Sequence, residues 1–326
     1  MKLLIHPKIY LVLFLIFINL TLQAQKERYE SAYNVLKEML EEKREPDFKK
    51  ALFTIENAWY NDSLSYTDFD NKIKTIADSC RLMIKRKGVV KFKTSGNWAI
   101  FMYMTKPMPE NKNKPYQYDF EDFLGDKDYS NTFVTRILRD GKGTCLSLPL
   151  LYKCIAQDLQ VEARLTIGPS HTWIRHTDEE GKWTNVELTS GQLPSDGVMI
   201  TELNIRIEAI KSGAYFNPLT EKESIAFLLT QLALGYEKKF GQLDEFTEKC
   251  SDLSIQYYAP NVVAYMSKSN RLAYKLHDQK NLTKEEKEKT QTEYLAIQKK
   301  LLDMGADTIS PKEYNNWVSS MQKRKE

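Results

Sequence analysis

Apolar and polar residues alternate at helical spacing through the first part of the chain, after an apolar run at the N-terminus. Such spacing places the apolar side chains on one face of a helix. Pro46 ends the first of these helices, and Thr67 or Asp68 is the expected N-cap of the last. The pattern predicts a helical N-terminal region over residues 25–95. The segments that show it are 26–44, 48–60 and 68–86.

The pattern changes in the next region, residues 96–198. The apolar run WAIFMYMT at 98–105 fits either a buried strand or a short helix, because periodicity alone does not separate them. A loop rich in Pro, Asn and Asp occupies 106–129, and its length favours a functional role. Its aromatic residues are a candidate substrate wall, although aromatic residues of loops more often simply pack onto the protein. Helices are expected at 130–140 and 145–159.

Three short runs with strand character follow, namely VEARLTI, HTWIRHT and KWTNVEL. Runs rich in β-branched and aromatic residues, bounded by turn residues, are typical of strands. A turn centred on Glu179 pairs the second and third runs as an antiparallel hairpin. That register sets Thr177 against Gly181 and His171 directly against Glu187.

The region after Pro194 returns to helical spacing and predicts a helical tail over residues 199–326. Its pattern matches either degenerate helix-pair repeats or a plain helical tail. The expected helices are 200–211, 221–238, 242–256, 261–277, 284–303 and 311–323. Helices with one small antiparallel sheet make the expected fold class α+β.

The charge balance argues against nucleic acid as a partner. Lys and Arg number 47 and Asp and Glu number 44 among 326 residues, so the formal net charge is only +3. Nucleic-acid binding domains usually carry a strongly basic surface. The chain is long enough for two modest domains.

Residues 1–24 have the layout of a secretory signal peptide. Lys2 and Lys8 precede the apolar run IYLVLFLIFI, and Ala24 lies just before the expected cut. The run is shorter than the roughly 20 apolar residues that a membrane-spanning helix needs, so an uncleaved anchor is the weaker alternative. We therefore expect an exported protein, periplasmic or secreted, with no membrane contact after signal cleavage.

Export matters for the four cysteines, because oxidising compartments form disulfides. Cys145 and Cys154 would lie about 13 Å apart along one helix, which is too far for a redox pair. Cys80 and Cys250 are either small buried residues or partners in a disulfide, and the sequence leaves that choice open.

Cys145, His171 and Glu187 form the pattern with catalytic potential. Cys145 follows GKGT at the start of an apolar helix, where a helix N-terminus favours a thiolate. Alternate residues of a strand share a face, so His171 and His176 point opposite ways, and no spacing of His or Cys supports a metal site. In the expected hairpin, the carboxylate of Glu187 is within hydrogen-bonding reach of the His171 imidazole.

These side chains would serve as nucleophile, base and orienting carboxylate in acyl transfer. The backbone N–H of Cys145 is the expected oxyanion donor, and Asn97 or Trp98 is a weaker candidate for a second donor. No metal ion or other cofactor is expected. The structural alternative is a cysteine in a core helix beside a His–Glu pair that only stabilises a sheet.

The order of several motifs resembles the core of the transglutaminase-like superfamily, whose members share a papain-like Cys–His–Asp triad. The motifs are a G-x-C helix start, a strand like VEAR, H-x-W and then W-x-x-V-[DE]-x-T, and the resemblance is strongest at 133–192. It implies a papain-like core in which the helix that bears the cysteine lies on a small antiparallel sheet. Cys145 would be the nucleophile, His171 the base and Glu187 the orienting residue, one methylene longer than the usual Asp.

Two further stretches, ALFTIENAWYNDSLSYTDFDNKIKTIADSC and YSNTFVTRILRDGKGTCLSL, resemble a narrower branch, the SirB-like proteins. That branch joins such a domain to a tetratricopeptide-like helical tail. Its members commonly have Pro where this chain has Cys145, so this cysteine brings the chain back towards the active pattern.

We therefore expect a cysteine-nucleophile enzyme that acts on amide bonds of a peptide or protein, as a peptidase, deamidase or acyltransferase. The sequence does not distinguish water from an amine as the acyl acceptor. The alternative is a catalytically inactive binding module whose helical tail holds a protein or peptide partner.

Overall fold

The computed structural model describes residues 7–277 and 282–306, and the side chains from residue 21 onward. The predicted helix at 311–323 and the first six residues of the predicted signal segment lie outside the described residues.

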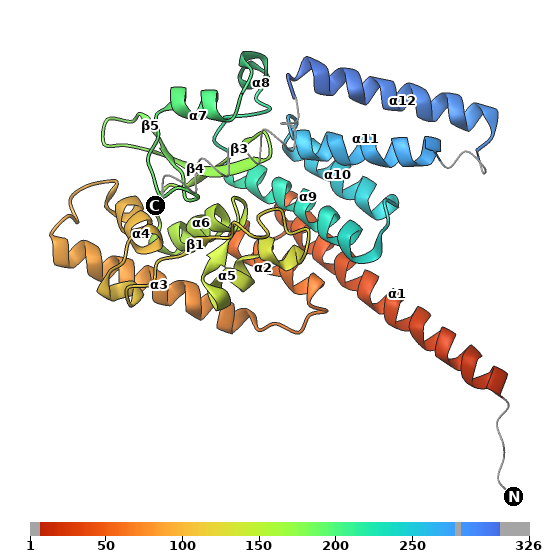
Figure 1. The fold of residues 1–326 in the computed structure, drawn as a ribbon, viewed down its shortest axis with the longest axis horizontal. Helices are drawn as coiled ribbons and strands as arrows, with labels where there is room; N and C mark the ends of the chain where they lie inside the picture. The colour runs from red at the N-terminus through yellow and green to blue at the C-terminus, as the bar shows by residue number, and fades with distance from the viewer. Residues whose placement is uncertain (1–6, 278–281, 307–326) are drawn as a thin grey trace, which may run out of the picture.

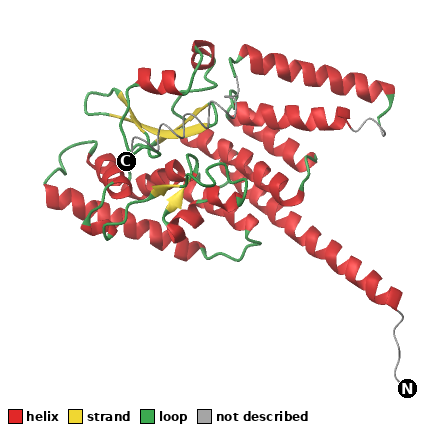
Figure 2. Ribbon diagram, viewed as in Figure 1, coloured by secondary structure: helices red, strands yellow, loops and turns green. Residues whose placement is uncertain are grey.

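Helices dominate the described chain and surround a small antiparallel sheet, so the predicted α+β class is confirmed (Figures 1 and 2). The helices before the sheet are α1 (Pro7–Leu40), α2 (Phe48–Trp59), α3 (Tyr66–Lys87), α4 (Ser95–Thr105), α5 (Val134–Asp140) and α6 (Ser147–Leu159), with short 3₁₀ helices η1 (Pro109–Asn111) and η2 (Tyr129–Thr132). The helices after it are α7 (Asp196–Glu202), α8 (Ile207–Lys211), α9 (Glu221–Phe240), α10 (Glu245–Tyr257), α11 (Val262–His277) and α12 (Lys284–Asp303).

The main sheet has three antiparallel strands in the order β3-β4-β5. They are β3 (Arg164–Gly168), β4 (His171–Thr177) and β5 (Trp183–Val186), and they confirm the three predicted strand runs. A two-residue parallel pair joins β1 (Gln117–Tyr118) to β2 (Lys142–Gly143), and it ties the long loop 106–129 to the segment just before Cys145.

Two local predictions are settled or corrected by the structure. The ambiguous run 98–105 is helical, because it forms most of α4. The N-cap of α3 is Ser65, and not Thr67 or Asp68: the Ser65 hydroxyl accepts the backbone N–H of Asp68 at 3.2 Å. A serine hydroxyl at this position satisfies one of the backbone donors that a helix start leaves unpaired.

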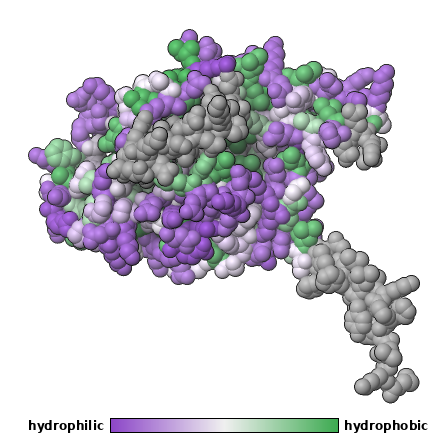
Figure 3. All heavy atoms as spheres, viewed as in Figure 1, coloured by the Kyte–Doolittle hydropathy of each residue, from purple (hydrophilic) through white to green (hydrophobic). Residues whose placement is uncertain are grey.

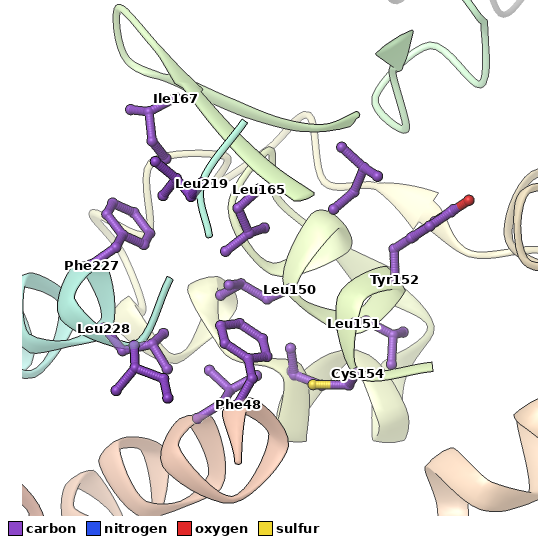
Figure 4. Packing of buried hydrophobic residues seen from close by; sticks show 14 of the residues in the cluster. Phe48, Leu150, Leu151, Tyr152, Cys154, Leu165, Ile167, Leu219, Phe227 and Leu228 are labelled. Carbon is purple, nitrogen blue, oxygen red and sulfur yellow. The ribbon is translucent and has the colours of Figure 1, made fainter. Parts of the chain in front are cut away.

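Helix α6 lies between the main sheet and the N-terminal helices. It packs against β3 and β4 on one side and against α2, α3 and α4 on the other (Figure 1). Figure 4 shows the side chains that join these layers, with Leu150 and Cys154 of α6 near Phe48 of α2, Leu165 of β3 and Leu228 of α9. The position of α6 is thus fixed from two sides by apolar packing.

The tail helices contact one another in chain order from α9 to α12, and α9 also packs against α1 and α2. The first part of α1 projects from the rest of the molecule (Figure 1). Much of the surface in view in Figure 3 is hydrophilic, with smaller hydrophobic areas between. No helix within the described residues is long and apolar enough to cross a membrane.

A buried carboxylate on α2 holds the start of α5, the helix that leads into the Cys145 turn. Glu56 accepts the backbone N–H of Val134 at 2.7 Å and that of Thr135 at 2.8 Å. Its residue is only 1% exposed, and burial raises the pKa of Glu56 to about 7 although these hydrogen bonds lower it. The carboxyl group therefore satisfies two helix-terminal donors, and its ionisation inside the core is unfavourable because it is desolvated there.

The raised pKa of Glu56 predicts that the free energy of unfolding depends on pH. A pKa raised in the folded state means that the fold retains a proton that the unfolded chain loses, so the contribution of Glu56 is complete below about pH 4.5 and is lost as the pH rises through about 7. The free energy of unfolding, measured in urea, should fall over this range relative to Glu56→Gln by on the order of 1–3 kcal/mol. A constant difference between the two proteins from pH 4.5 to pH 8 would contradict this.

Candidate active site

A short polar turn places Cys145 at the first position of helical hydrogen bonding. The carbonyl of Thr144 accepts the N–H of Leu148 at 3.1 Å, and the Thr144 hydroxyl accepts the N–H of Ser147 at 3.3 Å. Thr144 therefore acts as the N-cap, and the thiol follows it directly. The regular helix α6 is assigned from Ser147, two residues later than predicted, as is common at helix ends.

Gly143 allows this turn to lie close against α5. A Cβ at Gly143 would lie 2.4 Å from Cδ1 of Ile137 and 3.0 Å from Oγ of Ser147. The Ser147 hydroxyl in turn accepts the N–H of Thr144 at 2.9 Å. Any larger residue would push apart the two contacts that position Cys145, so the GKGT motif needs glycine here.

The hairpin between β4 and β5 has a different register from the predicted one. Thr177 pairs with Trp183, whereas the prediction set it against Gly181. The connecting loop ends at Gly181, whose φ is +82°, and three-residue hairpin loops commonly end on a residue with positive φ. The predicted turn was centred one residue too early, and the prediction that Glu187 lies directly opposite His171 is wrong.

The two side chains nevertheless meet. A shift of two positions keeps every residue on its face of the sheet, because side chains alternate with a period of two. Glu187 follows the end of β5 and lies diagonally from His171, and its Oε2 is 2.6 Å from His171 Nε2. Diagonal neighbours are about 7–8 Å apart at the backbone, a distance that long side chains span. The extra methylene of Glu, compared with Asp, suits this diagonal.

The His171–Glu187 pair is enclosed, with side-chain exposures of 0% and 3%. Burial raises the pKa of Glu187, but the facing His171 and the N–H of Thr189, which donates to Oε1 at 2.7 Å, outweigh burial and hold the pKa below its usual value. The carboxylate is therefore ionised at neutral pH.

The pKa of the His171 imidazole is shifted upward, opposite to the shift of Glu187. Burial lowers the pKa of His171, but the charge of Glu187 and a hydrogen bond with Cys145 outweigh it, so the pKa is raised. The ring is therefore protonated at neutral pH. Because Nε2 faces Glu187, Nδ1 is the ring nitrogen that can exchange a proton with the sulfur.

The indole of Trp173 supports the imidazole from the same strand face. The rings of His171 and Trp173 stack with centroids 6.1 Å apart and an angle of 16° between their planes. Trp173 Nε1 donates to Oδ1 of Asn185 at 3.0 Å, which fixes the indole. A Cβ at Gly168 would lie 2.9 Å from Cζ3 of Trp173, so the indole also requires a glycine on β3.

Cys145 and His171 line a pocket of about 230 Å³ beside the β3–β4 turn. The opposite wall comes from the tail and was not predicted from the sequence. It consists of Tyr215, Phe227, Gln231 and Leu234 with Val262, Val263 and Met266. The helical spacing of these tail residues indicates one face of α9 and one of α11. It does not indicate which part of the protein those faces contact.

The weaker oxyanion candidates lie elsewhere. Neither Asn97 nor Trp98 lines the pocket that Cys145 and His171 share. Asn97 is buried, and its Oδ1 accepts the hydroxyl of Tyr152 at 2.9 Å, further along α6. The backbone N–H of Cys145 is at the helix start, and its role as oxyanion donor stays a prediction.

The long loop 106–129 does not line this pocket either. Tyr118 is buried, and its ring meets that of Phe120 edge to face at 4.9 Å. Tyr116 and Phe123 are partly buried against the core. The loop therefore packs onto the body of the protein, and its expected role as a wall beside the thiol is not supported.

All four cysteines lie within the described residues, and none forms a disulfide. Cys80, Cys154 and Cys250 are 0% exposed, whereas Cys145 is 9% exposed. Burial raises the pKa of Cys80 to about 12 and also raises the pKa of the Cys154 and Cys250 thiols. The open choice for Cys80 and Cys250 is settled in favour of small buried residues.

No group of three or more His, Cys, Asp or Glu within 7–277 and 282–306 is arranged to hold a metal ion. Comparisons with protein-family models, curated proteins and solved structures find no match to this chain.

The pairing of His171 with Glu187 predicts a measurable titration. Glu187→Gln removes the negative charge and should lower the pKa of His171 by about 1–3 pH units, as followed by NMR of the ring protons. His176, which lies on the opposite face and whose pKa is lowered by burial, is the internal control and should not change. An unaltered His171 titration would show that the carboxylate does not set its charge.

Proposed function

We propose that this protein is a cysteine-nucleophile enzyme that acts on amide bonds through Cys145, His171 and Glu187. The observation that carries the proposal is the enclosed contact of 2.6 Å between His171 and Glu187, on a ring that lines the same pocket as Cys145. A His–Glu pair that only stabilised a sheet would have no use for a thiol at the first turn of a helix, beside a pocket.

The geometry supports the following steps. The protonated ring of His171 holds Cys145 as a thiolate, and this thiolate attacks the amide carbonyl carbon to form a C–S bond. The N–H of Cys145 faces the oxyanion, and the helix N-terminus stabilises its charge. His171 then gives the proton to the amide nitrogen, the C–N bond breaks and an amine leaves a thioester on Cys145.

The second half of the reaction returns the enzyme to its starting state. Water or a second amine loses a proton to His171 as it attacks the thioester carbonyl, and the C–S bond breaks. The acyl group leaves as an acid or as a new amide, and His171 keeps the proton beside the released thiolate. Peptidase, deamidase and acyltransferase activities differ only in the amide that is cleaved and in the acceptor.

The arrangement of elements also favours a transglutaminase-like, papain-like core. Helix α6 carries the cysteine and packs on a small antiparallel sheet, whose middle strand carries His171 and whose last strand leads to Glu187. These positions agree with the order of the motifs in that superfamily. We propose in addition that the chain is exported, on the layout of residues 1–24.

An inactive binding module is the second candidate, and the low exposure of the site favours it. Cys145 is 9% exposed and the His171 side chain is 0% exposed, so a large substrate needs some opening of the pocket wall. In that case the pocket would hold a peptide without chemistry.

Alkylation of Cys145 separates the two functions. Iodoacetamide near neutral pH should modify Cys145 rapidly, and His171→Ala should slow the reaction by about tenfold or more, because the thiolate loses its counter-ion. Peptide mapping by mass spectrometry gives the rate at each cysteine. Cys80, Cys154 and Cys250 are buried and should react only after unfolding.

His176→Ala is the matched control, since it removes a histidine of the same strand from the opposite face, and Cys145→Ser gives the blank. Labelling of Cys145 that is no faster than that of an ordinary exposed thiol, and equal in His171→Ala and wild type, would exclude an activated nucleophile and favour the binding module.

A further inference from the structure

We propose that the pocket between Cys145 and the helical tail is a subsite for one apolar side chain of the substrate, that of the residue whose carbonyl Cys145 attacks. This inference rests on the proposed function and names its substrate class: amides whose acyl residue is of the Leu, Met or Phe type. The helices α9 and α11, outside the catalytic residues, would select that side chain.

The tail wall is built from two helical stripes. Phe227, Gln231 and Leu234 repeat at intervals that share one face of α9, and Val263 and Met266 share one face of α11. Both stripes face the turn between β3 and β4, where Ile167 and Gly168 complete the lining. The surfaces available to a guest side chain are therefore mainly aliphatic and aromatic.

The lining contains no Asp, Glu, Lys or Arg, and the charge of its one histidine, His171, is already paired with Glu187. A charged guest side chain would lose its hydration without gaining a partner, which costs far more than burial of an apolar one. Another pocket of this protein differs in this respect, because charged side chains of both signs line it together. The pocket of about 320 Å³ beside the end of α6 is lined by Lys153, Glu162, Arg164 and Glu221.

The size of the pocket favours a single side chain. Its volume of about 230 Å³ is below the roughly 300–1,000 Å³ of pockets that enclose drug-sized ligands. Met266 and Val263 are only half-buried, and methionine adapts its shape to irregular guests. The wall can therefore fit apolar side chains of different shapes.

The connectivity of the thioester decides which substrate residue enters. In that intermediate the sulfur is bonded to the carbonyl carbon, the carbonyl carbon to Cα and Cα to Cβ. Because Cys145 lines the pocket itself, the side chain nearest to the sulfur is that of the acyl residue. Its burial would hold the carbonyl beside the sulfur and His171, which is the positioning that acyl transfer needs.

Chloromethyl ketones of N-acetyl-leucine, N-acetyl-aspartate and N-acetyl-lysine test this subsite. They alkylate an activated cysteine and differ in the side chain next to the reacting carbon. The full-length protein should react at Cys145 about tenfold or more faster with the leucine probe than with either charged probe, because only that probe gains burial in the pocket. Mass spectrometry assigns the modified cysteine and gives the rates.

Met266→Lys places a cation in the wall and should reduce the ratio of the leucine rate to the aspartate rate by at least tenfold. Tyr274→Lys is the matched control, because it adds the same charge on the same helix at a position that is 65% exposed and outside the lining. Thermal unfolding by circular dichroism confirms that each variant is folded. If Met266→Lys does not fold, Met266→Ala should enlarge the site and raise the rate of an N-acetyl-tryptophan probe relative to leucine.

The outcomes separate this inference from the proposed function. Alkylation by iodoacetamide that depends on His171, with equal rates for the three probes or a ratio unchanged by the wall variants, overturns the subsite and leaves the nucleophile in place. Alkylation that ignores His171 overturns the proposed function, and the subsite with it.

Discussion

The contact between His171 Nε2 and Glu187 Oε2 is the interaction on which the site depends. Both side chains are almost fully enclosed, so neither could hold its charge without the other, and loss of one partner would leave an uncompensated buried charge. The need to keep the two charges together also constrains the β4–β5 hairpin. The β4–β5 register must keep both residues on one face, and the stacked indole of Trp173 must hold the imidazole in place. The His171–Glu187 pair is therefore a constraint on the register of the sheet, whatever chemistry it supports.

The sulfur reaches this pair by a separate route through local structure. Glu56 secures the start of α5, Gly143 lets the following turn lie against that helix, and Thr144 caps the first turn that carries Cys145. Apolar packing of α6 between the sheet and α2 then fixes the distance between the two halves (Figure 4). Two sets of short-range contacts, joined by one core, are sufficient to bring the thiol to the imidazole.

The sequence predicted the features that depend on local pattern. The helices at 48–60 and 284–303, the strand HTWIRHT and the shared face of His171 and Glu187 follow from periodicity. The shared face survived a wrong register because a shift of two positions preserves it, whereas a shift of one would have destroyed it. The wrong predictions concern features that do not depend on the hydrophobic pattern. The hairpin loop depended on the positive φ of Gly181, and the position of Asn97 depended on tertiary packing.

The wall of the pocket could not be predicted from the sequence either, because it also depends on tertiary packing. The two sides of the pocket come from different parts of the chain. The cysteine, the histidine and the glutamate come from α6, β4 and the residues after β5, whereas the opposite wall of the pocket comes mainly from α9 and α11. Helix α9 is held by α1 and α2 as well as by the rest of the tail, so its face towards Cys145 is rigidly supported. Substitutions on the half-buried face of α11 would then change the shape of the pocket beside the sulfur without altering His171 or Glu187. Under the proposed function, a helical tail placed in this way would give the site its selectivity while the sheet and α6 supply its reactive groups.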